Sequence, residues 1–173
     1  MANKCKYKVA YLELNSANRI SFLNNKKFIT DHFKHLNIDF YPNVIYRDLI
    51  NILSHKYDFF IIDMGVLNQN SLAEFLRQDA RFIIGYSNRI KAPTYNNYIN
   101  FILSPYDIKD NNKNKILKNT NTTLLSNLGL SDDIKTFSKQ YHCSLNSIPF
   151  FFNPFHLTSA EWNFFQDMTK HIL

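Results

Sequence analysis

Short unbroken runs of apolar residues alternate along the chain with longer segments in which apolar residues recur every three or four positions. The central run is residues 57–63, Tyr-Asp-Phe-Phe-Ile-Ile-Asp, closely followed by Gly65. Unbroken β-branched and aromatic residues are typical of a strand buried on both faces, as in the centre of a parallel sheet. Asp63 then lies at the carboxyl end of that strand, where open α/β sheets bind ligands. Two roles fit this place: holding magnesium, as in nucleotide hydrolases, or accepting N–H groups of the following turn.

The remaining pattern predicts a regular order of elements. Apolar runs predict strands at residues 7–14, 38–41, 81–86, 122–127 and 147–151. Helical spacing predicts helices at residues 21–36, 44–55, 72–78, 93–105 and 131–141, and a last helix from Thr158. The buried face of this last helix should consist of Trp162, Phe165, Met168 and Ile172. The polar segment 107–121 is expected to be a loop or a weak helix.

Strands and helices alternate almost throughout, which is the pattern of a mostly parallel sheet covered on both faces by right-handed crossovers. The chain has 173 residues, the size of one ordinary domain. We therefore predict a single α/β domain over residues 1–173, with three α/β/α layers and a mostly parallel sheet of about five to seven strands.

Charge narrows the choice of partners only slightly. The formal net charge is +6 and the sequence pI is near 9.2, a balance that suits an acidic protein, a nucleic acid or an anionic membrane surface. The basic residues are scattered, however, and their densest run, residues 109–118, is interleaved with Asn and Asp. A solvated loop explains that run better than a binding stripe.

The sequence also indicates a compartment. Cys5 and Cys143 are far apart and form no Cys-x-x-Cys pair, so we predict a reducing, cytoplasmic setting and no metal site. No apolar segment reaches the length of a transmembrane span, and the polar N-terminus does not resemble a signal peptide.

The order of the motifs resembles that of the MinD/ParA group of P-loop ATPases. The segments that carry the resemblance are Val9–Asn15, Tyr57–Asp63, Phe82–Gly85, Leu124–Asn127 and Ile148–Phe150. Ile148-Pro149-Phe150 followed by Asn153–Leu157 is the most family-like part, and the chain is more narrowly similar to small ParA-like proteins of Firmicutes. The resemblance covers the chain from about Lys8 onward, and it implies a P-loop NTPase-like, Rossmann-like fold.

The resemblance also implies remnants of a nucleotide and magnesium site. Asp63 matches the aspartate at the end of the switch II strand, which in the family reaches magnesium through water. Asn127 matches the asparagine that lies near the adenine. Glu13 lies on the strand whose end carries the family's second acidic position.

The main departure from the family is the missing phosphate-binding loop. No G-x-x-x-x-G-K-[ST] motif exists in the sequence, whose three glycines are Gly65, Gly85 and Gly129. Without that loop there is no cradle of N–H groups for a triphosphate and no lysine at the transferred group. We therefore expect no catalytic residues, no bound ATP or magnesium, and no nucleotide hydrolysis by this chain alone.

Two alignments explain the missing loop. In the first, Val9–Leu14 is the family's second strand and the P-loop strand is absent. In the second, Val9–Leu14 is the P-loop strand itself and Asn15–Ser21 is a degenerate loop, with Arg19 near the place of the lysine. The local sequence Tyr-Leu-Glu-Leu-Asn, residues 11–15, favours the first alignment. Fold completeness favours the second, because the P-loop strand normally lies in mid-sheet and its deletion would leave two apolar strands unpaired or forced together.

The function expected from this resemblance is that of a catalytically inactive ParA/MinD-like protein. It would act as a binding, positioning or regulatory partner of another protein or of a second copy, in a pilus, secretion, partition or division system. One alternative is a receiver-like phosphoacceptor, although receivers need an acidic pair where this chain has Glu13-Leu14-Asn15. The other alternative is an N-terminally shortened ATPase.

Overall fold

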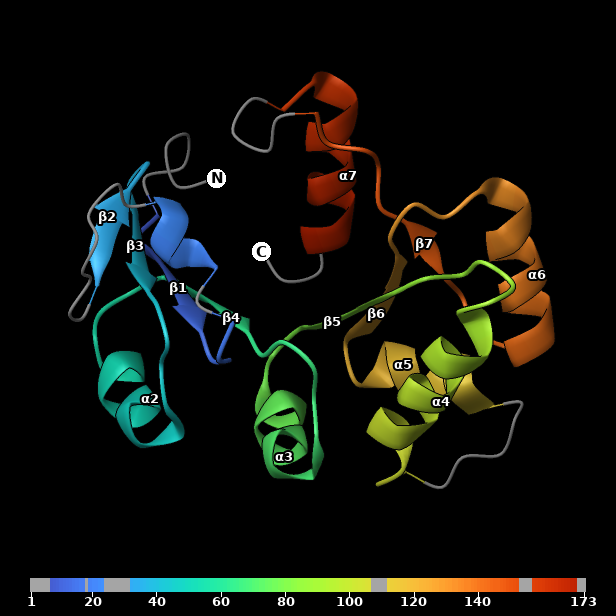
Figure 1. The fold of residues 1–173 in the computed structure, drawn as a ribbon, viewed down its shortest axis with the longest axis horizontal. Coiled ribbons are helices and arrows are strands. Elements are labelled where there is room, and N and C mark those ends of the chain that lie inside the picture. The colour runs from blue at the N-terminus through green and yellow to red at the C-terminus, as the bar shows by residue number, and fades with distance from the viewer. Residues whose placement is uncertain (1–6, 18, 24–31, 107–111, 153–156, 171–173) are drawn as a thin grey trace. The chain divides into compact units, whose positions relative to one another are not determined.

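The computed structural model describes residues 7–17, 19–23, 32–106, 112–152 and 157–170 (Figure 1). The chain divides into two compact units, residues 1–75 and 76–173, and each is described by itself. Each unit combines helices with a sheet whose strands are mostly parallel, so the predicted α/β class is confirmed. The strands form two sheets, of four and three strands. The single domain over residues 1–173 stays a prediction.

The first unit contains a four-stranded sheet in the order β2-β3-β1-β4. Its strands are β1 (Val9–Glu13), β2 (Phe33–His35), β3 (Ile38–Tyr41) and β4 (Phe59–Asp63). The central strand β1 runs parallel to both β3 and β4, whereas β2 pairs antiparallel with β3. A short 3₁₀ helix, η1 (Ile20–Leu23), follows β1. The predicted strand at 57–63 therefore exists, but it is an edge strand of its sheet.

One face of this sheet carries the core of the unit. Helix α2 (Tyr46–Leu53) places Leu49 in a cluster with residues of β1 and its flanks. The cluster consists of Ala10, Leu12, Leu14, Tyr41, Val44 and Leu49. Successive side chains of β1 point to opposite faces of the sheet. Ala10, Leu12 and Leu14 therefore point into this core, whereas Tyr11 and Glu13 point to the opposite face.

The predicted helix at 21–36 is wrong at its end, where Phe33–His35 is a strand. Leu36 and Asn37 both have positive φ, at 48° and 63°, and join β2 to β3 as a two-residue hairpin turn requires. The rings of Phe33 and Phe40 stack across this hairpin with centroids 5.3 Å apart. This cross-strand contact prevails over the helical spacing of the apolar residues. Residues 24–31 of the predicted helix lie outside the described residues.

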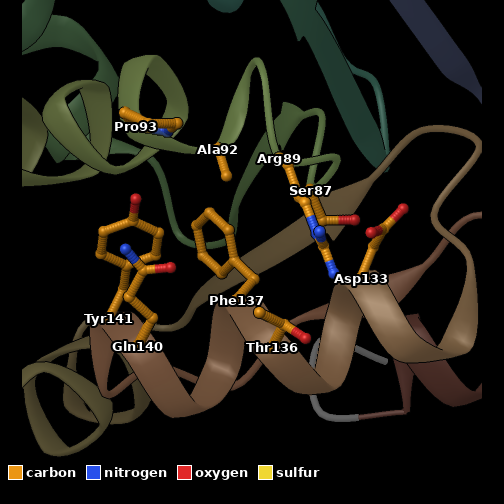
Figure 2. A pocket seen from close by; sticks show the side chains of 9 residues that line it. All are labelled: Ser87, Arg89, Ala92, Pro93, Asp133, Thr136, Phe137, Gln140 and Tyr141. Atoms are coloured by element: carbon orange, nitrogen blue, oxygen red, sulfur yellow. The ribbon is translucent and has the colours of Figure 1, made fainter.

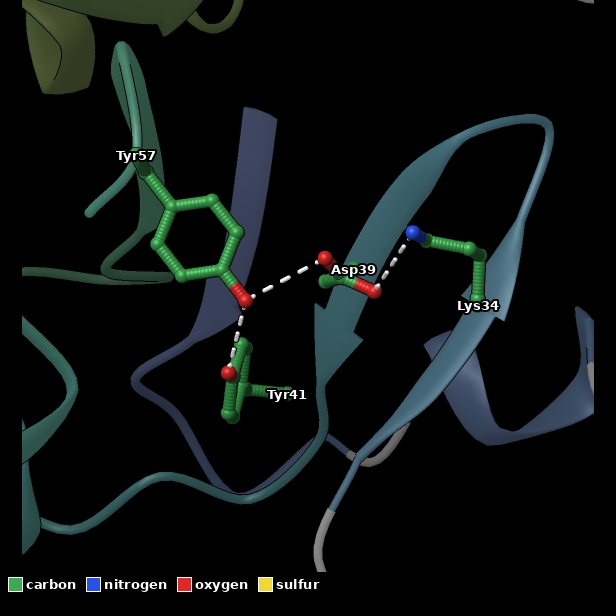
Figure 3. Close-up of polar contacts among 4 residues, drawn as sticks. All are labelled: Lys34, Asp39, Tyr41 and Tyr57. Carbon is green, nitrogen blue, oxygen red and sulfur yellow. Dashed lines mark hydrogen bonds and ion pairs between the residues drawn. The ribbon is translucent and has the colours of Figure 1, made fainter. Parts of the chain in front are cut away.

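A polar network ties the hairpin to the segment before β4 (Figure 3). The Tyr57 hydroxyl donates to Asp39 Oδ2 at 3.2 Å and lies 2.9 Å from the Tyr41 hydroxyl. The Lys34 ammonium is 3.7 Å from the other oxygen of Asp39. Burial, followed by the interactions with Tyr41 and Asp39, raises the pKa of the Tyr57 phenol. The phenol therefore stays protonated and serves as a donor at physiological pH.

The second unit contains a parallel sheet in the order β5-β6-β7. Its strands are β5 (Arg81–Gly85), β6 (Thr122–Ser126) and β7 (Asn146–Ser147), and α3 (Gln69–Arg77) lies where the chain passes into this unit. The other helices are α4 (Ala92–Leu103), α5 (Lys113–Asn119), α6 (Ser131–Tyr141) and α7 (Ser159–Thr169). The predicted strand at 147–151 is wrong beyond Ser147, because Pro149 has no N–H for a sheet ladder.

Helix α4 lies close against β5 at Gly85. A Cβ atom at Gly85 would lie 2.3–2.5 Å from carbon atoms of the Tyr95 ring, so only glycine fits. The Tyr95 hydroxyl is 2.8 Å from the carbonyl oxygen of Ile83 and 2.9 Å from that of Leu125. Tyr95 thus fastens α4 to both β5 and β6.

Replacing Tyr95 by phenylalanine should lower the free energy of unfolding by about 1–3 kcal/mol, because the buried carbonyl groups lose a donor. The exposed Tyr46 offers the matched control, since Tyr46→Phe removes a hydroxyl at the surface and should change stability by less than about 0.5 kcal/mol. Urea unfolding followed by circular dichroism measures both. Equal effects of the two substitutions would contradict the role given to the Tyr95 hydroxyl.

The C-terminal helix α7 begins where the sequence predicts, but its apolar face is only partly covered. Thr158 and Glu161 form a capping box at its start. Phe165 is 37% exposed and stacks on Phe151 at 5.3 Å, while Trp162 and Met168 are half-buried. The predicted Ile172 lies outside the described residues. Helical spacing identifies residues that share a side, but it does not supply a surface to cover them.

The sequence expectations about membrane spans and about cysteines can both be compared with the described part of the chain. No helix there is long and apolar enough to cross a membrane. Cys143 is a free thiol in the core, and burial raises its pKa to about 11. The thiol therefore stays protonated at neutral pH and is a poor nucleophile.

Candidate functional site

The candidate site is the carboxyl end of β1 and β4. These strands are parallel and in register, with Glu13 opposite Asp63. The two acids that the resemblance selects therefore lie side by side at one sheet edge. Asn15, just beyond β1, donates from Nδ2 to the backbone oxygen of Asp63 at 3.1 Å and joins the two strand ends.

Glu13 is fully buried and only partly satisfied. Its Oε1 atom accepts the backbone N–H of Arg19 at 2.6 Å. Its Oε2 atom is buried and has no hydrogen-bond partner in the described part of the chain. Arg19 thus meets the carboxylate through its backbone, and the loop after β1 closes over Glu13. Burying a carboxylate oxygen without a partner costs free energy.

Both oxygens of Asp63 have donors from the chain itself. Oδ2 accepts the Tyr11 hydroxyl at 3.1 Å, and Oδ1 accepts the Gly65 N–H at 2.9 Å. Gly65 has a φ of +60°, and a Cβ there would lie 2.9 Å from Asn15 Cβ, so the turn requires glycine. The sequence allowed two roles for Asp63, holding magnesium or accepting N–H groups of the following turn. The hydrogen bond from Gly65 is of the second kind.

Tyr11 is the donor that sequence reasoning missed. Burial, then the charge of Asp63 and the hydrogen bond to it, raise the pKa of the Tyr11 phenol, and Glu13 raises it further. The phenol is therefore neutral over the physiological range and holds its proton toward Asp63. The alternation of β1 is the signal that could have found it, because Tyr11 shares a face with Glu13.

This arrangement is a cluster of hydrogen bonds made by the chain itself, and among the described residues it offers no set of ligands for a directly bound magnesium ion. Magnesium takes six oxygen ligands in near-octahedral geometry, several of them water. Here three of the four carboxylate oxygens accept hydrogen bonds from the chain, and the fourth is sealed inside. The described residues also contain no group of three or more His, Cys, Asp or Glu side chains placed to hold a metal.

The third sequence-selected residue, Asn127, belongs to the second unit. It directly follows β6, and its backbone N–H donates to the Gly85 oxygen at 2.8 Å. Its side-chain amide is 3.5 Å from the Tyr86 hydroxyl. Asn127 thus ends the β5–β6 ladder, a structural role that needs no nucleotide.

A small pocket in the second unit was not predicted from the sequence. It has a volume of about 90 Å³ and lies between the start of α4 and the side of α6 (Figure 2). Arg89 reaches it from the loop before α4, and Asp133 from the first turn of α6. Phe137 and Tyr141 form part of its wall. A space of this size holds a few water molecules and not a nucleotide.

Replacing Glu13 by glutamine should raise the free energy of unfolding by about 1 kcal/mol at pH 7. The amide oxygen can still accept the Arg19 N–H, and the neutral group costs less to bury than a carboxylate with one unpaired oxygen. Urea unfolding measures the change, with Asp48→Asn on the exposed side of α2 as the control for loss of a charge. A loss of more than 1 kcal/mol in Glu13→Gln would mean that the carboxylate has a compensating partner.

Comparison with known proteins leaves the family open. No protein-family model matches the chain, and no curated protein matches it either. The function is therefore inferred from the geometry of these residues together with the resemblance stated above.

Proposed function

We propose that this chain is a catalytically inactive relative of the ParA/MinD ATPases that acts as a binding, positioning or regulatory partner. The observation that carries the proposal is the paired acid-ended strands β1 and β4. Their carboxylates accept hydrogen bonds from Tyr11, Arg19 and Gly65 in a sequence without a phosphate-binding loop. The partner is another protein or a second copy of the chain, and the net charge of +6 favours acidic surfaces.

The proposal includes a three-layer, P-loop NTPase-like arrangement with the P-loop strand absent. Parallel strands linked through helices, as in β5–α4–α5–β6, support the layered arrangement. The sheet order supports the first alignment, in which Val9–Leu14 is the second strand. That alignment leaves two apolar strands unpaired, and β4 and β5 are each at an edge of their sheets.

The direct test is a phosphate-release assay with ATP and magnesium. Wild-type protein and Asp63→Asn should both release phosphate at the rate of the buffer blank, because the sequence contains no phosphate-binding loop to cradle the phosphates. Magnesium-dependent release that Asp63→Asn abolishes would make the chain an ATPase. The shortened-ATPase alternative has a separate test in the coding DNA. An in-frame sequence upstream of Met1 that encodes a Gly-rich Lys-Thr loop would support it.

The receiver-like alternative has its own test. A phosphoacceptor aspartate needs a metal beside it to hold the phosphoryl oxygens, whereas the Asp63 oxygens accept hydrogen bonds from Tyr11 and Gly65 and no group of metal-binding side chains occurs in the described part of the chain. Incubation with acetyl phosphate and magnesium should therefore leave the intact mass unchanged. Gain of one phosphoryl group in the wild-type protein, absent in Asp63→Asn, would favour the receiver function instead.

A further inference from the structure

The pocket between α4 and α6 is built entirely from residues of the second unit. Its lining consists of the loop between β5 and α4, the first residues of α4 and one side of α6 (Figure 2). The α6 residues share that side because they are spaced three or four positions apart. They are Asp133, Thr136, Phe137, Gln140 and Tyr141. The pocket is therefore a product of how two helices of one unit pack.

Two opposite charges line this pocket without neutralising each other directly. Arg89 enters from the loop before α4, and Asp133 enters from the first turn of α6. Neither side chain has an ion-pair partner among the described residues. A small molecule that carries both a carboxylate and an ammonium group would satisfy both charges at once.

Ser87 adds a buried hydrogen-bond donor to the same lining. It lies just beyond β5 and is 4% exposed. Its N–H donates to the Ser126 hydroxyl oxygen at 3.2 Å, and its own hydroxyl oxygen accepts the Ser126 hydroxyl at 2.9 Å. A hydroxyl group has one hydrogen to donate, and the described residues supply no acceptor for that of Ser87. This hydrogen is therefore left for an acceptor in the pocket.

The size of the pocket limits the ligand to a very small molecule. Its volume of about 90 Å³ equals that of roughly three water molecules. The rings of Phe137 and Tyr141 give it an apolar wall beside the charged groups. An α-amino acid carries a carboxylate and an ammonium group on the same carbon. Glycine and alanine therefore match both the pair of charges and the space.

We propose that this pocket binds a small α-amino acid of the glycine and alanine class. The ligand carboxylate lies against Arg89 and accepts the Ser87 hydroxyl, and the ligand ammonium donates to Asp133. The methyl group of alanine lies on the ring of Phe137. This binding site goes beyond the partner role proposed above, and it shares no residue with the acid-ended strands β1 and β4.

Saturation-transfer NMR with L-alanine and the full chain, without nucleotide, tests the proposal. So small a ligand has few atoms that can contribute to binding, so we expect saturable binding with a Kd of about 1 mM. Acetate lacks the ammonium group and methylammonium lacks the carboxylate. Each should bind at least about tenfold more weakly than L-alanine, because one charge of the pocket then stays unpaired.

Two pocket variants and two matched controls locate the site. Arg89→Gln and Asp133→Asn should each weaken L-alanine binding at least about tenfold, because each removes one charged partner. Lys135→Gln and Asp132→Asn remove the same charges from exposed positions of α6 outside the pocket. They should leave the Kd within about twofold of wild type, since exposed charges are screened by salt. Circular dichroism establishes that all four variants are folded.

Three outcomes would overturn the proposal. The first is no saturable binding of L-alanine by folded wild-type protein up to about 50 mM. The second is equal affinity for acetate and L-alanine, which would make the pocket a site for small anions in general. The third is equal weakening of binding in the pocket variants and in their controls. Since nucleotide is absent from all samples, each of these outcomes leaves the phosphate-release result untouched.

Discussion

Replacing Phe137 by alanine should lower the free energy of unfolding of the second unit by about 3–5 kcal/mol. Phe137 is 1% exposed, on the side of α6 that meets α4. Its ring centroid lies 5.3 Å from that of Tyr95 and 4.7 Å from that of Tyr141. Truncation would remove the ring between two others and leave a cavity that fixed strands and helices cannot fill.

The matched control for Phe137 is Phe152, which is 93% exposed in the same unit. Phe152→Ala removes the same side-chain atoms, but from a position exposed to water. It should change the free energy of unfolding by no more than about 0.5 kcal/mol. Urea unfolding followed by circular dichroism and by the fluorescence of Trp162 compares the two variants. A loss below 1 kcal/mol in Phe137→Ala would contradict the packing of α6 on α4.

Replacing Leu12 by alanine should cost the first unit about 2–5 kcal/mol, toward the upper end of that range. Leu12 is fully buried in the central strand β1, and its neighbours Tyr41 and Ile62 lie on the strands at either side. Strands on both sides prevent the site from collapsing around a smaller residue, so the cavity persists.

The exposed apolar Ile50 of α2 provides the control for the first unit, since it is 76% exposed. Ile50→Ala should leave stability within about 0.5 kcal/mol of wild type, because little surface changes its burial. Thermal and urea unfolding by circular dichroism measure both variants. If Ile50→Ala lowered the free energy of unfolding as much as Leu12→Ala, the core of this unit would have to lie on the other side of α2.

Where the local pattern dominates, the sequence predicts the fold well. The apolar runs locate β1, β3, β4, β5 and β6, because a buried strand needs apolar side chains whatever its neighbours are. The pattern fails at Phe33–His35, where spacing compatible with a helix is overruled by pairing with β3. It also fails to identify β4 and β5 as edge strands, because an apolar run is the same in the centre and at the edge of a sheet.

For the candidate site, the sequence predicts which strand ends meet but not which groups donate hydrogen bonds to the two acids. Parallel neighbouring strands bring their carboxyl ends together, so Glu13 and Asp63 can be expected at one edge. The donors that occupy them depend on turns: Arg19 acts through its backbone and Gly65 through a positive φ. The burial of the Arg81 guanidinium, whose Nε and Nη1 atoms have no hydrogen-bond partner among the described residues, leaves no trace in the sequence, since only three-dimensional packing decides which groups surround it.

The central claim is that this chain has no working nucleotide site. In the resembling family, most binding energy for a triphosphate comes from loop N–H groups, the lysine and the metal, whereas the switch II aspartate orients the metal. Each lost charge-assisted hydrogen bond is worth roughly 1.5–3 kcal/mol. Loss of two or three of them lowers affinity by about three orders of magnitude or more.

Titration calorimetry with ATP and magnesium tests this claim most directly, on wild-type protein and on Asp63→Ala. The account predicts no binding heat at micromolar nucleotide in either protein. It also predicts that Asp63→Ala lowers stability, because Tyr11 and Gly65 lose their acceptor. Micromolar, magnesium-dependent ATP binding by the wild type that disappears in a folded Asp63→Ala variant would contradict the account and make Asp63 part of a working site.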